Sequence, residues 1–389
     1  MKRLIFRVLD SRTLEILVFL AIFLLNLRLV YWQTQTESDY SGHIDFTAKI
    51  FNENFQMPHP LLHFLVHGGF LVTGMPYVFV MSLLVASLSI VDIVICKRVI
   101  RYYRPGFSHA SVYLFAAIAA NTFVAIFVPW YNPLPYLGQW SPNIWHNPTM
   151  AVLKPLAILG FWGSLITLGS PGFVRRWIPW LTSLCLFAGT LAKPSFIICF
   201  IPAVGVFLLI FGRKSLGMWR SAILLFLPSL SLLAWQFLRT YTRFAVPGIF
   251  QDKIVISYFA ATGTYAPHVW FSSLLVLAFP LTVLVAIRKR LLRNMPLLVS
   301  FLLAFVGFLQ GSFLAEENKP AYGNFVFGYI ISLFMVYLFC LIEYLDWWHP
   351  EGKTKVSVAW KGVTSVVMAA HLISGFIYWR DLILGRYIF

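Results

Sequence analysis

The sequence consists largely of apolar runs about as long as a helix that crosses a bilayer. Such a helix needs about 20 apolar residues. Runs of roughly that size lie at 14–32, 76–96, 107–129, 148–169, 177–192, 195–212, 219–238, 270–287, 294–314, 325–346 and 357–378. Only 11% of the 389 residues are charged, whereas soluble domains carry about a quarter. We therefore expect an all-α polytopic membrane protein with about 11 (10–13) transmembrane helices.

The positive charges fall into short clusters between the apolar runs. Nucleic-acid binding would require a basic face, so the net charge of +16 does not indicate that partner. Lys and Arg favour the cytoplasmic side of a membrane. With a cytoplasmic N-terminus, that side receives the clusters at 97–104, 175–176, 213–220, 288–293 and 353–361. The lipid bilayer is thus the first expected partner, and we expect an integral protein of the plasma (inner) membrane.

This orientation depends on residues 60–74, an apolar stretch that also contains His63, His67 and Gly68-Gly69. The stretch is short for a span, so we expect a re-entrant or interfacial helix, with a twelfth span as the alternative. The chain then forms a single transmembrane domain, 1–389. Its non-cytoplasmic segments are 33–75, 130–147, 239–269 and 315–324. Because the inner loops are short, we expect function on the outer face, with 33–75 as the catalytic loop.

Segment 33–75 gathers four of the fourteen acids and four of the nine histidines: Glu37, Asp39, Asp45, Glu53, His43, His59, His63 and His67. Asp39 and His43 are four residues apart, on one face of a predicted amphipathic helix. A carboxylate and an imidazole at that spacing can share a proton or orient one, which fits a general base that takes the proton of a hydroxyl. The alternative is that Ser38 or Asp39 caps the helix.

The histidines of this segment also raise the question of a metal. His59, His63 and His67 recur every four residues, so they align along one helical face. The outer two are then about 12 Å apart along the axis, too far for one small ion. We therefore predict no metal site here, although a divalent ion stays possible as a cofactor. A sugar or phosphate groove lined by histidine fits the pattern better.

The first 105 or so residues resemble the GT-C superfamily of membrane glycosyltransferases. The resemblance rests on Asp39-Tyr40, an amphipathic stretch at 44–55, Pro58-His59-Pro60-Leu61-Leu62, and Gly74 before the second span. It implies that Asp39 is the catalytic base and that the donor is a sugar on a polyprenyl phosphate or diphosphate. Many members have a second acid beside the first. Here the neighbours are Ser38 and Tyr40, which leaves Glu37 and Asp45 as candidates for that role.

A lipid-phosphate leaving group needs cations near the outer leaflet. The candidates are His146, Lys154, Lys193, Arg239 and Arg243. Lys154 lies about two turns into an apolar run, where an unpaired ammonium is costly; the alternative is that it snorkels to the interface. Arg239 and Arg243, four apart, form a phosphate clamp or merely anchor a span. Glu316 is a candidate for binding the acceptor or a divalent ion, against a solvated turn.

The sequence therefore predicts a glycosyltransferase that moves a sugar from a polyprenyl-(di)phosphate donor to an acceptor hydroxyl on a glycan, lipid or protein. The resemblance implies inversion at the anomeric carbon. One alternative is a polymerase or ligase of lipid-linked cell-surface glycans. The other is a transporter or flippase, which the helix-breaking pairs Lys154-Pro155 and Lys193-Pro194 would suit.

Overall fold

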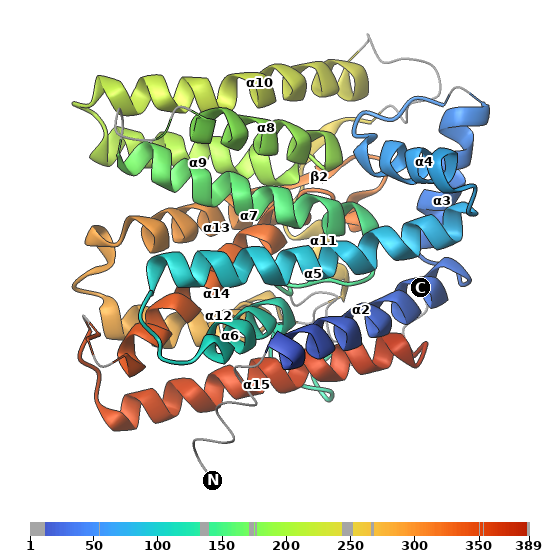
Figure 1. Ribbon diagram of the computed structural model, residues 1–389. Helices are drawn as coiled ribbons and strands as arrows, with labels where there is room; N and C mark the ends of the chain where they lie inside the picture. Colours follow the sequence, from blue (N-terminus) through green and yellow to red (C-terminus); the bar gives the residue numbers. More distant parts are fainter. Residues whose placement is uncertain are drawn as a thin grey trace.

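The computed structural model describes residues 12–53, 55–132, 140–170, 175, 177–242, 252–265, 268–349, 351–352 and 354–386. These residues form a helical bundle with one two-stranded sheet (Figure 1). The elements are α2 (Arg12–Thr34), α3 (Asp39–Asn52), α4 (Leu61–Thr73), α5 (Tyr77–Tyr103), α6 (Ala110–Thr122), α7 (Pro148–Gly169), α8 (Trp177–Ala192), α9 (Ser195–Phe211), α10 (Leu216–Tyr241), β1 (Ile254–Ile256), α11 (Ala260–Tyr265), α12 (Val269–Ile287), η1 (Leu291–Arg293), α13 (Met295–Phe313), β2 (Leu314–Glu316), η2 (Pro320–Tyr322), α14 (Val326–Trp348) and α15 (Val358–Ile383).

Within the described residues, eight helices are long and apolar enough to cross a membrane: α2, α5, α7, α10, α12, α13, α14 and α15. Four more, α4, α6, α8 and α9, are apolar but shorter. Every apolar run of the sequence contains a helix. The prediction of an all-α polytopic membrane protein is confirmed at this level, whereas the count of 11 spans stays a prediction.

The outer surface of the bundle is apolar. Ile16 on α2, Ile223 on α10 and Ile373 on α15 are 60–64% exposed, and neighbouring Leu and Phe side chains on the same helices are exposed as well. Water disfavours so much contiguous apolar surface, whereas hydrocarbon accepts it. Together with the eight long helices, this surface identifies an integral membrane protein.

The centre of the bundle is α14, which is buried along most of its length and packs against α12 and α13. One contact shows how the core accommodates a proline. Pro280 in α12 has no N–H, so the carbonyl of Val276 one turn earlier loses its helical partner. The hydroxyl of Tyr337 on α14 donates to that carbonyl. The contact satisfies the interrupted helix and fixes α12 against α14.

The run at 107–129 differs from the single span that it predicts. The helix α6 covers Ala110–Thr122 only, and residues 123–128 continue without helical structure inside the bundle. Non-helical backbone is tolerated at such a place only when protein groups satisfy it. Here the partners are Ser141 Oγ for the N–H of Ala125 (3.2 Å), Ser374 Oγ for the N–H of Phe127 (2.9 Å), His371 Nδ1 for the carbonyl of Val124 (2.6 Å), and Asn143 Nδ2 for the carbonyl of Phe123 (2.8 Å).

The two ends of the bundle differ (Figure 1). One end, called here the α3 end, carries α3, α4, α11 and the sheet, in which β1 pairs antiparallel with β2. Since α2 ends there and α5 begins there, α3 and α4 add no crossing between these two spans. The opposite end carries the described Lys and Arg clusters, such as 97–104 and 288–293, and is called the basic end.

Candidate functional site

The start of α3 leaves the carboxylate of Asp39 unused by helix capping. Ser38 is the N-cap, and its Oγ accepts from the backbone N–H groups of Tyr40 (3.2 Å) and Ser41 (3.4 Å). The hydroxyl of Ser41 in turn accepts from the N–H of Ser38 (3.1 Å), which completes a capping box. Of the two capping residues proposed from the sequence, Ser38 therefore has that role, and Asp39 is exposed at the first helical position.

The residue after Asp39 fixes α3 beside the chain that leads into α7. Tyr40 is 1% exposed, and its hydroxyl donates to the carbonyl of Trp145 (3.4 Å). Gln33, near the end of α2, donates its side-chain amide to the same carbonyl (3.1 Å). Two helices thus hold one loop carbonyl, and Asp39 comes to lie next to the start of α7.

A directed series of hydrogen bonds leads from Lys193 to Asp39. Asn147 donates its Nδ2 to Asp39 Oδ2 (2.7 Å), and its Oδ1 accepts from the hydroxyl of Thr149 (2.7 Å). That hydroxyl accepts from Lys193 Nζ (3.2 Å). Each of the three hydrogen bonds is therefore donated from the Lys193 side toward Asp39. We call Lys193, Thr149, Asn147 and Asp39 the Asp39 chain.

Asn147 is part of this chain because of how α7 begins. Its Oδ1 also accepts from the N–H of Met150 (3.1 Å), so it is the N-cap, and Pro148 follows at the first helical position. Sequence reasoning singled out neither Asn147 nor Thr149 as a site residue. The signal for Asn147 is an Asn directly before Pro at the start of an apolar run, which indicates a helix N-cap.

Lys193 supplies positive charge to the Asp39 chain. It lies in the break between α8 and α9, is 8% exposed, and places Nζ 3.8 Å from the centroid of the Phe327 ring. Burial lowers the pKa of Lys193 to about 8, and the carboxylates of Asp39 and Glu316 oppose that shift. Lys193 is therefore mostly charged at pH 7 and within electrostatic reach of both acids.

The neighbouring histidines are neutral at pH 7. Burial lowers the pKa of His146 to about 4, although the charge of Asp39 works against the shift. Burial, followed by the charges of Lys193 and His63, lowers the pKa of His59 to about 3. His146 also pairs its Nδ1 with the hydroxyl of Tyr378 at 2.8 Å. These imidazoles provide hydrogen bonds, and Lys193 provides charge.

His43 does not share a proton with Asp39. In the described chain these two residues have no hydrogen bond to each other, so the pairing expected from their spacing is absent. The ring of His43 instead lies 5.3 Å from that of His63, whose Nδ1 pairs with the hydroxyl of Thr47 at 2.8 Å. Burial lowers the pKa of His43 well below its usual range, and the charge of His63 lowers it further.

The remaining candidates are distributed around the α3 end. Glu316 lies in β2, half-buried, where it accepts from the hydroxyl of Tyr241 (2.7 Å) and the amide of Asn324. Arg239 lies near the end of α10 with its guanidinium 5.6 Å from the Trp235 ring centroid. The expected partner of Arg239, Arg243, lies outside the described residues.

The two acids proposed as a second carboxylate, Glu37 and Asp45, are both exposed. Neither has a hydrogen bond to Asp39 among the described residues. Their exposure leaves them at the surface of the α3 end, while the Asp39 chain runs inward through Asn147. The structure therefore brings Asp39 together with Lys193, and not with a second acid.

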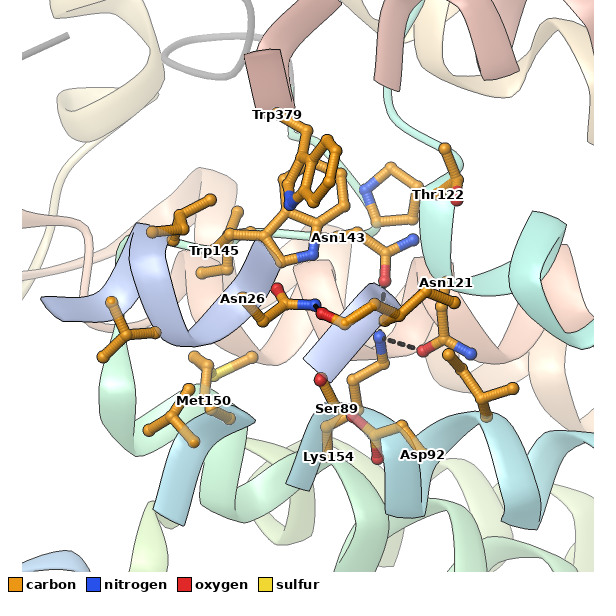
Figure 2. A pocket seen from close by; sticks show the side chains of 18 of the residues that line it. Asn26, Ser89, Asp92, Asn121, Thr122, Asn143, Trp145, Met150, Lys154 and Trp379 are labelled. Carbon is orange, nitrogen blue, oxygen red and sulfur yellow. Dashed lines mark hydrogen bonds between the residues drawn. The ribbon is translucent and has the colours of Figure 1, made fainter. Parts of the chain in front are cut away.

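Lys154 lies apart from this group. It follows Asn147 by seven residues on α7, about 10 Å further along the helix axis. Its ammonium donates to the amide oxygens of Asn121 (2.7 Å) and Asn143 (2.5 Å), as the dashed lines of Figure 2 show. It also lies 4.2 Å from the centroid of the Phe334 ring. Lys154 is thus held by amides inside the bundle and does not snorkel to an interface.

Lys154 faces a cavity of about 150 Å³ bordered by α2, α5, α6, α7, α14 and α15. Asp92 on α5, 5% exposed, borders the same cavity close to Lys154 (Figure 2). Asn26 and Ser89 add further polar groups to a mostly apolar lining. Of the predicted site residues, Asp39 and Lys193 thus belong to the Asp39 chain, whereas Lys154 borders this inner cavity.

In the part of the chain that the structure describes, no group of three or more His, Cys, Asp or Glu side chains is placed to hold a metal ion. In comparisons with known proteins, no family model matches the chain, and no curated protein matches it. The functional argument therefore rests on the geometry of the residues.

Proposed function

We propose that the protein is a membrane glycosyltransferase that transfers a sugar from a polyprenyl-(di)phosphate donor to an acceptor hydroxyl, with Asp39 as the general base. The observation that supports this proposal best is the Asp39 chain. The exposed carboxylate accepts a hydrogen bond at Oδ2 from Asn147. A buried ammonium, Lys193, is linked to it through two intervening side chains.

The proposed reaction is a single displacement. The acceptor hydroxyl gives its proton to Asp39 as its oxygen forms a bond to the anomeric carbon. The bond from that carbon to the phosphate oxygen breaks, and its electron pair goes to the phosphate. Lys193 stabilises the growing negative charge, because an ammonium in a partly desolvated site acts strongly on nearby charge. Inversion of the sugar follows from this single step.

The position of the Asp39 chain suits a donor whose lipid tail is embedded in a bilayer. The exposed apolar surface of the long helices continues onto α4, where Leu71 is 68% and Val72 is 86% exposed, so lipid would reach this edge of the α3 end. A polyprenyl chain lying among lipids would present its phosphate at that edge. Neutral His59 and His146 would add hydrogen bonds to sugar or phosphate oxygens.

The test is sugar transfer by purified protein in nanodiscs, with a panel of polyprenyl-phosphate and polyprenyl-diphosphate sugars. Asp39→Asn keeps the size of the side chain and its ability to accept from Asn147, but removes the base. We expect transfer to fall about 10³-fold. Asp45→Asn, at another exposed position of the same helix and with no hydrogen bond to Asp39 among the described residues, is the matched control and should keep the native rate.

Each outcome is informative. If Asp39→Asn unfolds no more easily than the native chain but transfers sugar at the native rate, another residue is the base. If the native chain consumes no donor, the transferase proposal fails as a whole. Products longer than one added unit would favour the polymerase alternative.

A transporter is the second candidate, and the cavity at Lys154 is the observation that favours it. Transporters place ionisable groups inside the membrane at their substrate sites. Lys154 and Asp92 are such a pair. Exchange of lipid-linked sugar across a liposome bilayer without chemical change would support this candidate over the first.

A further inference from the structure

The cavity at Lys154 opens toward the lipid-facing surface. Phe376 on α15 borders the cavity and is 56% exposed, so the lining continues to the outside of the bundle. Ile22 on α2 and Trp379 on α15 border the same side. A molecule of the bilayer would therefore reach the cavity on this side, at α2 and α15, without passing through water.

Hydrogen-bonding capacity remains unused at the inner wall. Asp92 Oδ1 is buried and has no hydrogen-bond partner among the described residues. The ammonium of Lys154 has three N–H groups, of which the amides of Asn121 and Asn143 take two. The hydroxyl of Ser89 donates to the carbonyl of Ala86 (2.7 Å), so its lone pairs remain for a ligand. The wall thus offers both acceptors and a donor.

The charge of the cavity disfavours an anionic ligand. Two amide oxygens and the face of the Phe334 ring already stabilise the ammonium of Lys154. As a carboxylate, Asp92 balances that charge, so the two groups sum to zero. An anion would meet the carboxylate at short range in a low-dielectric setting. Hydroxyl groups both donate and accept, and they match the unused atoms without adding charge.

Two indole rings restrict the class of ligand further. Trp145 and Trp379 lie together at one side of the cavity (Figure 2). Flat aromatic faces provide apolar contact for the C–H groups of a ring-shaped polyol, while the polar wall contacts its hydroxyls. The cavity has a volume of about 150 Å³ and continues to the exposed Phe376, so a ring-shaped head can lie inside while its tail extends outward.

We propose that this cavity binds the uncharged polyol head of a membrane amphipath, with the apolar tail leaving between α2 and α15. Lys154 then donates to a hydroxyl and does not contact a phosphate. None of the four residues of the Asp39 chain lines this cavity, although Tyr40, the neighbour of Asp39, does. The proposal is independent of the transfer reaction, because the test reads equilibrium binding.

The test compares three amphipaths with the same tail: octyl glucoside, octyl phosphate and 1-octanol. Each is radiolabelled and titrated into protein held in phosphatidylcholine nanodiscs, with empty nanodiscs as the blank. We expect saturable binding of octyl glucoside, about tenfold or more tighter than either of the others. Tighter binding of octyl phosphate, or equal binding of octanol, would overturn the proposal.

Variants locate the binding and test the charge argument. Asp92→Asn removes the balancing charge, so octyl glucoside should bind about tenfold more weakly and octyl phosphate should gain affinity. Ser89→Ala removes one acceptor with little change in volume and should weaken octyl glucoside several-fold, about threefold or more. The control is Ser87→Ala, at an exposed position of α5. Octyl glucoside binding that neither Asp92→Asn nor Ser89→Ala weakens would place the ligand elsewhere.

Discussion

Lys193 is the residue on which the charge balance beside Asp39 depends. The residue is 8% exposed, and a buried charge persists only when neighbours stabilise it. Here the Phe327 ring, the hydroxyl of Thr149 and two carboxylates do so. The imidazoles of His59 and His146 are neutral at pH 7. A proton lost from Lys193 therefore removes the positive charge from the Asp39 chain.

Sugar transfer should accordingly fall on the alkaline side of about pH 8. The pKa of Lys193 is lowered to about 8, so the side chain is charged below that pH and neutral above it. If the ammonium stabilises the leaving phosphate, the rate should drop about tenfold for each pH unit above the pKa. Lys193→Arg keeps the charge to pH 12 and beyond, and should move the falling limb up by more than one unit.

Rates measured from pH 6 to 10 check this prediction. Lys214→Arg, an exposed exchange at the basic end, is the control and should leave the profile unchanged. An alkaline limb that stays in place in Lys193→Arg would mean that another group titrates. Lys193→Met should be slow at every pH, because it has no charge to lose.

Sequence reasoning at this scale found the charged residues but not their partners. Asp39 and Lys193 were both predicted as site residues. The link between them runs through Asn147, which is 108 residues from Asp39 along the chain, and through Thr149, which is 44 residues from Lys193. Contacts over such separations depend on how helices pack, and no local pattern encodes them. Lys154 was predicted as a phosphate ligand, whereas two asparagines hold it inside the bundle.

At the scale of elements, α6 shows that hydropathy alone does not predict where a helix ends. The apolar run continues to residue 129, so length alone predicts a full span. Residues 123–128 are non-helical because Ser141, Asn143, Ser374 and His371 satisfy their backbone from other parts of the chain. The early end of α6 also provides space for residues 140–146 to enter the bundle. A sequence window around α6 contains none of these partners.

Asn143 is the residue that should matter most for this segment. It donates to the carbonyls of Ala120 (2.9 Å) and Phe123 (2.8 Å), and it accepts from Lys154. Asn143→Leu leaves two buried carbonyls without a donor, so the free energy of unfolding should fall by about 2 kcal/mol or more. Unfolding of detergent-solubilised protein by SDS, followed by loss of helical circular dichroism, measures the change.

The control for this change is Asn52→Leu, at an exposed position at the end of α3. It makes the same substitution where the side chain has no buried partner, and we expect it to change the free energy of unfolding by about 0.5 kcal/mol or less. Equal stability of the two variants would contradict a structural role for Asn143.

For the whole molecule, the two ends define an axis along the bundle. At the basic end, Arg104 after α5 contacts Glu343 and Asp346 on α14, both at 3.1 Å. The acids are 5% and 3% exposed, so this contact joins the outer helix α5 to the central helix. At the α3 end lies the Asp39 chain. The helical runs and the sorting of positive charge were predictable, because both follow from the chemistry of a bilayer.

The difference between the two ends of the bundle predicts how the protein is oriented in the membrane. Since Lys and Arg favour the cytoplasm, the basic end should face inward and Asp39 outward. All four native cysteines are free and buried, so single exposed cysteines can be labelled against a low background. Asp45→Cys, on α3, should react with a membrane-impermeant maleimide in intact cells. Lys214→Cys, at the basic end, should react only after the membrane is permeabilised.

The opposite labelling pattern would mean that the protein has the inverted orientation in the membrane. Asp39 and Lys193 would then face the cytoplasm, and a donor presented on the outer leaflet would not reach them. The cavity between α2 and α15 would be unaffected, because it opens to lipid along the side of the bundle. Cysteine labelling therefore tests the transfer proposal separately from the binding proposal. The transfer proposal requires that position 45 be labelled from outside the cell. The binding proposal does not depend on that result.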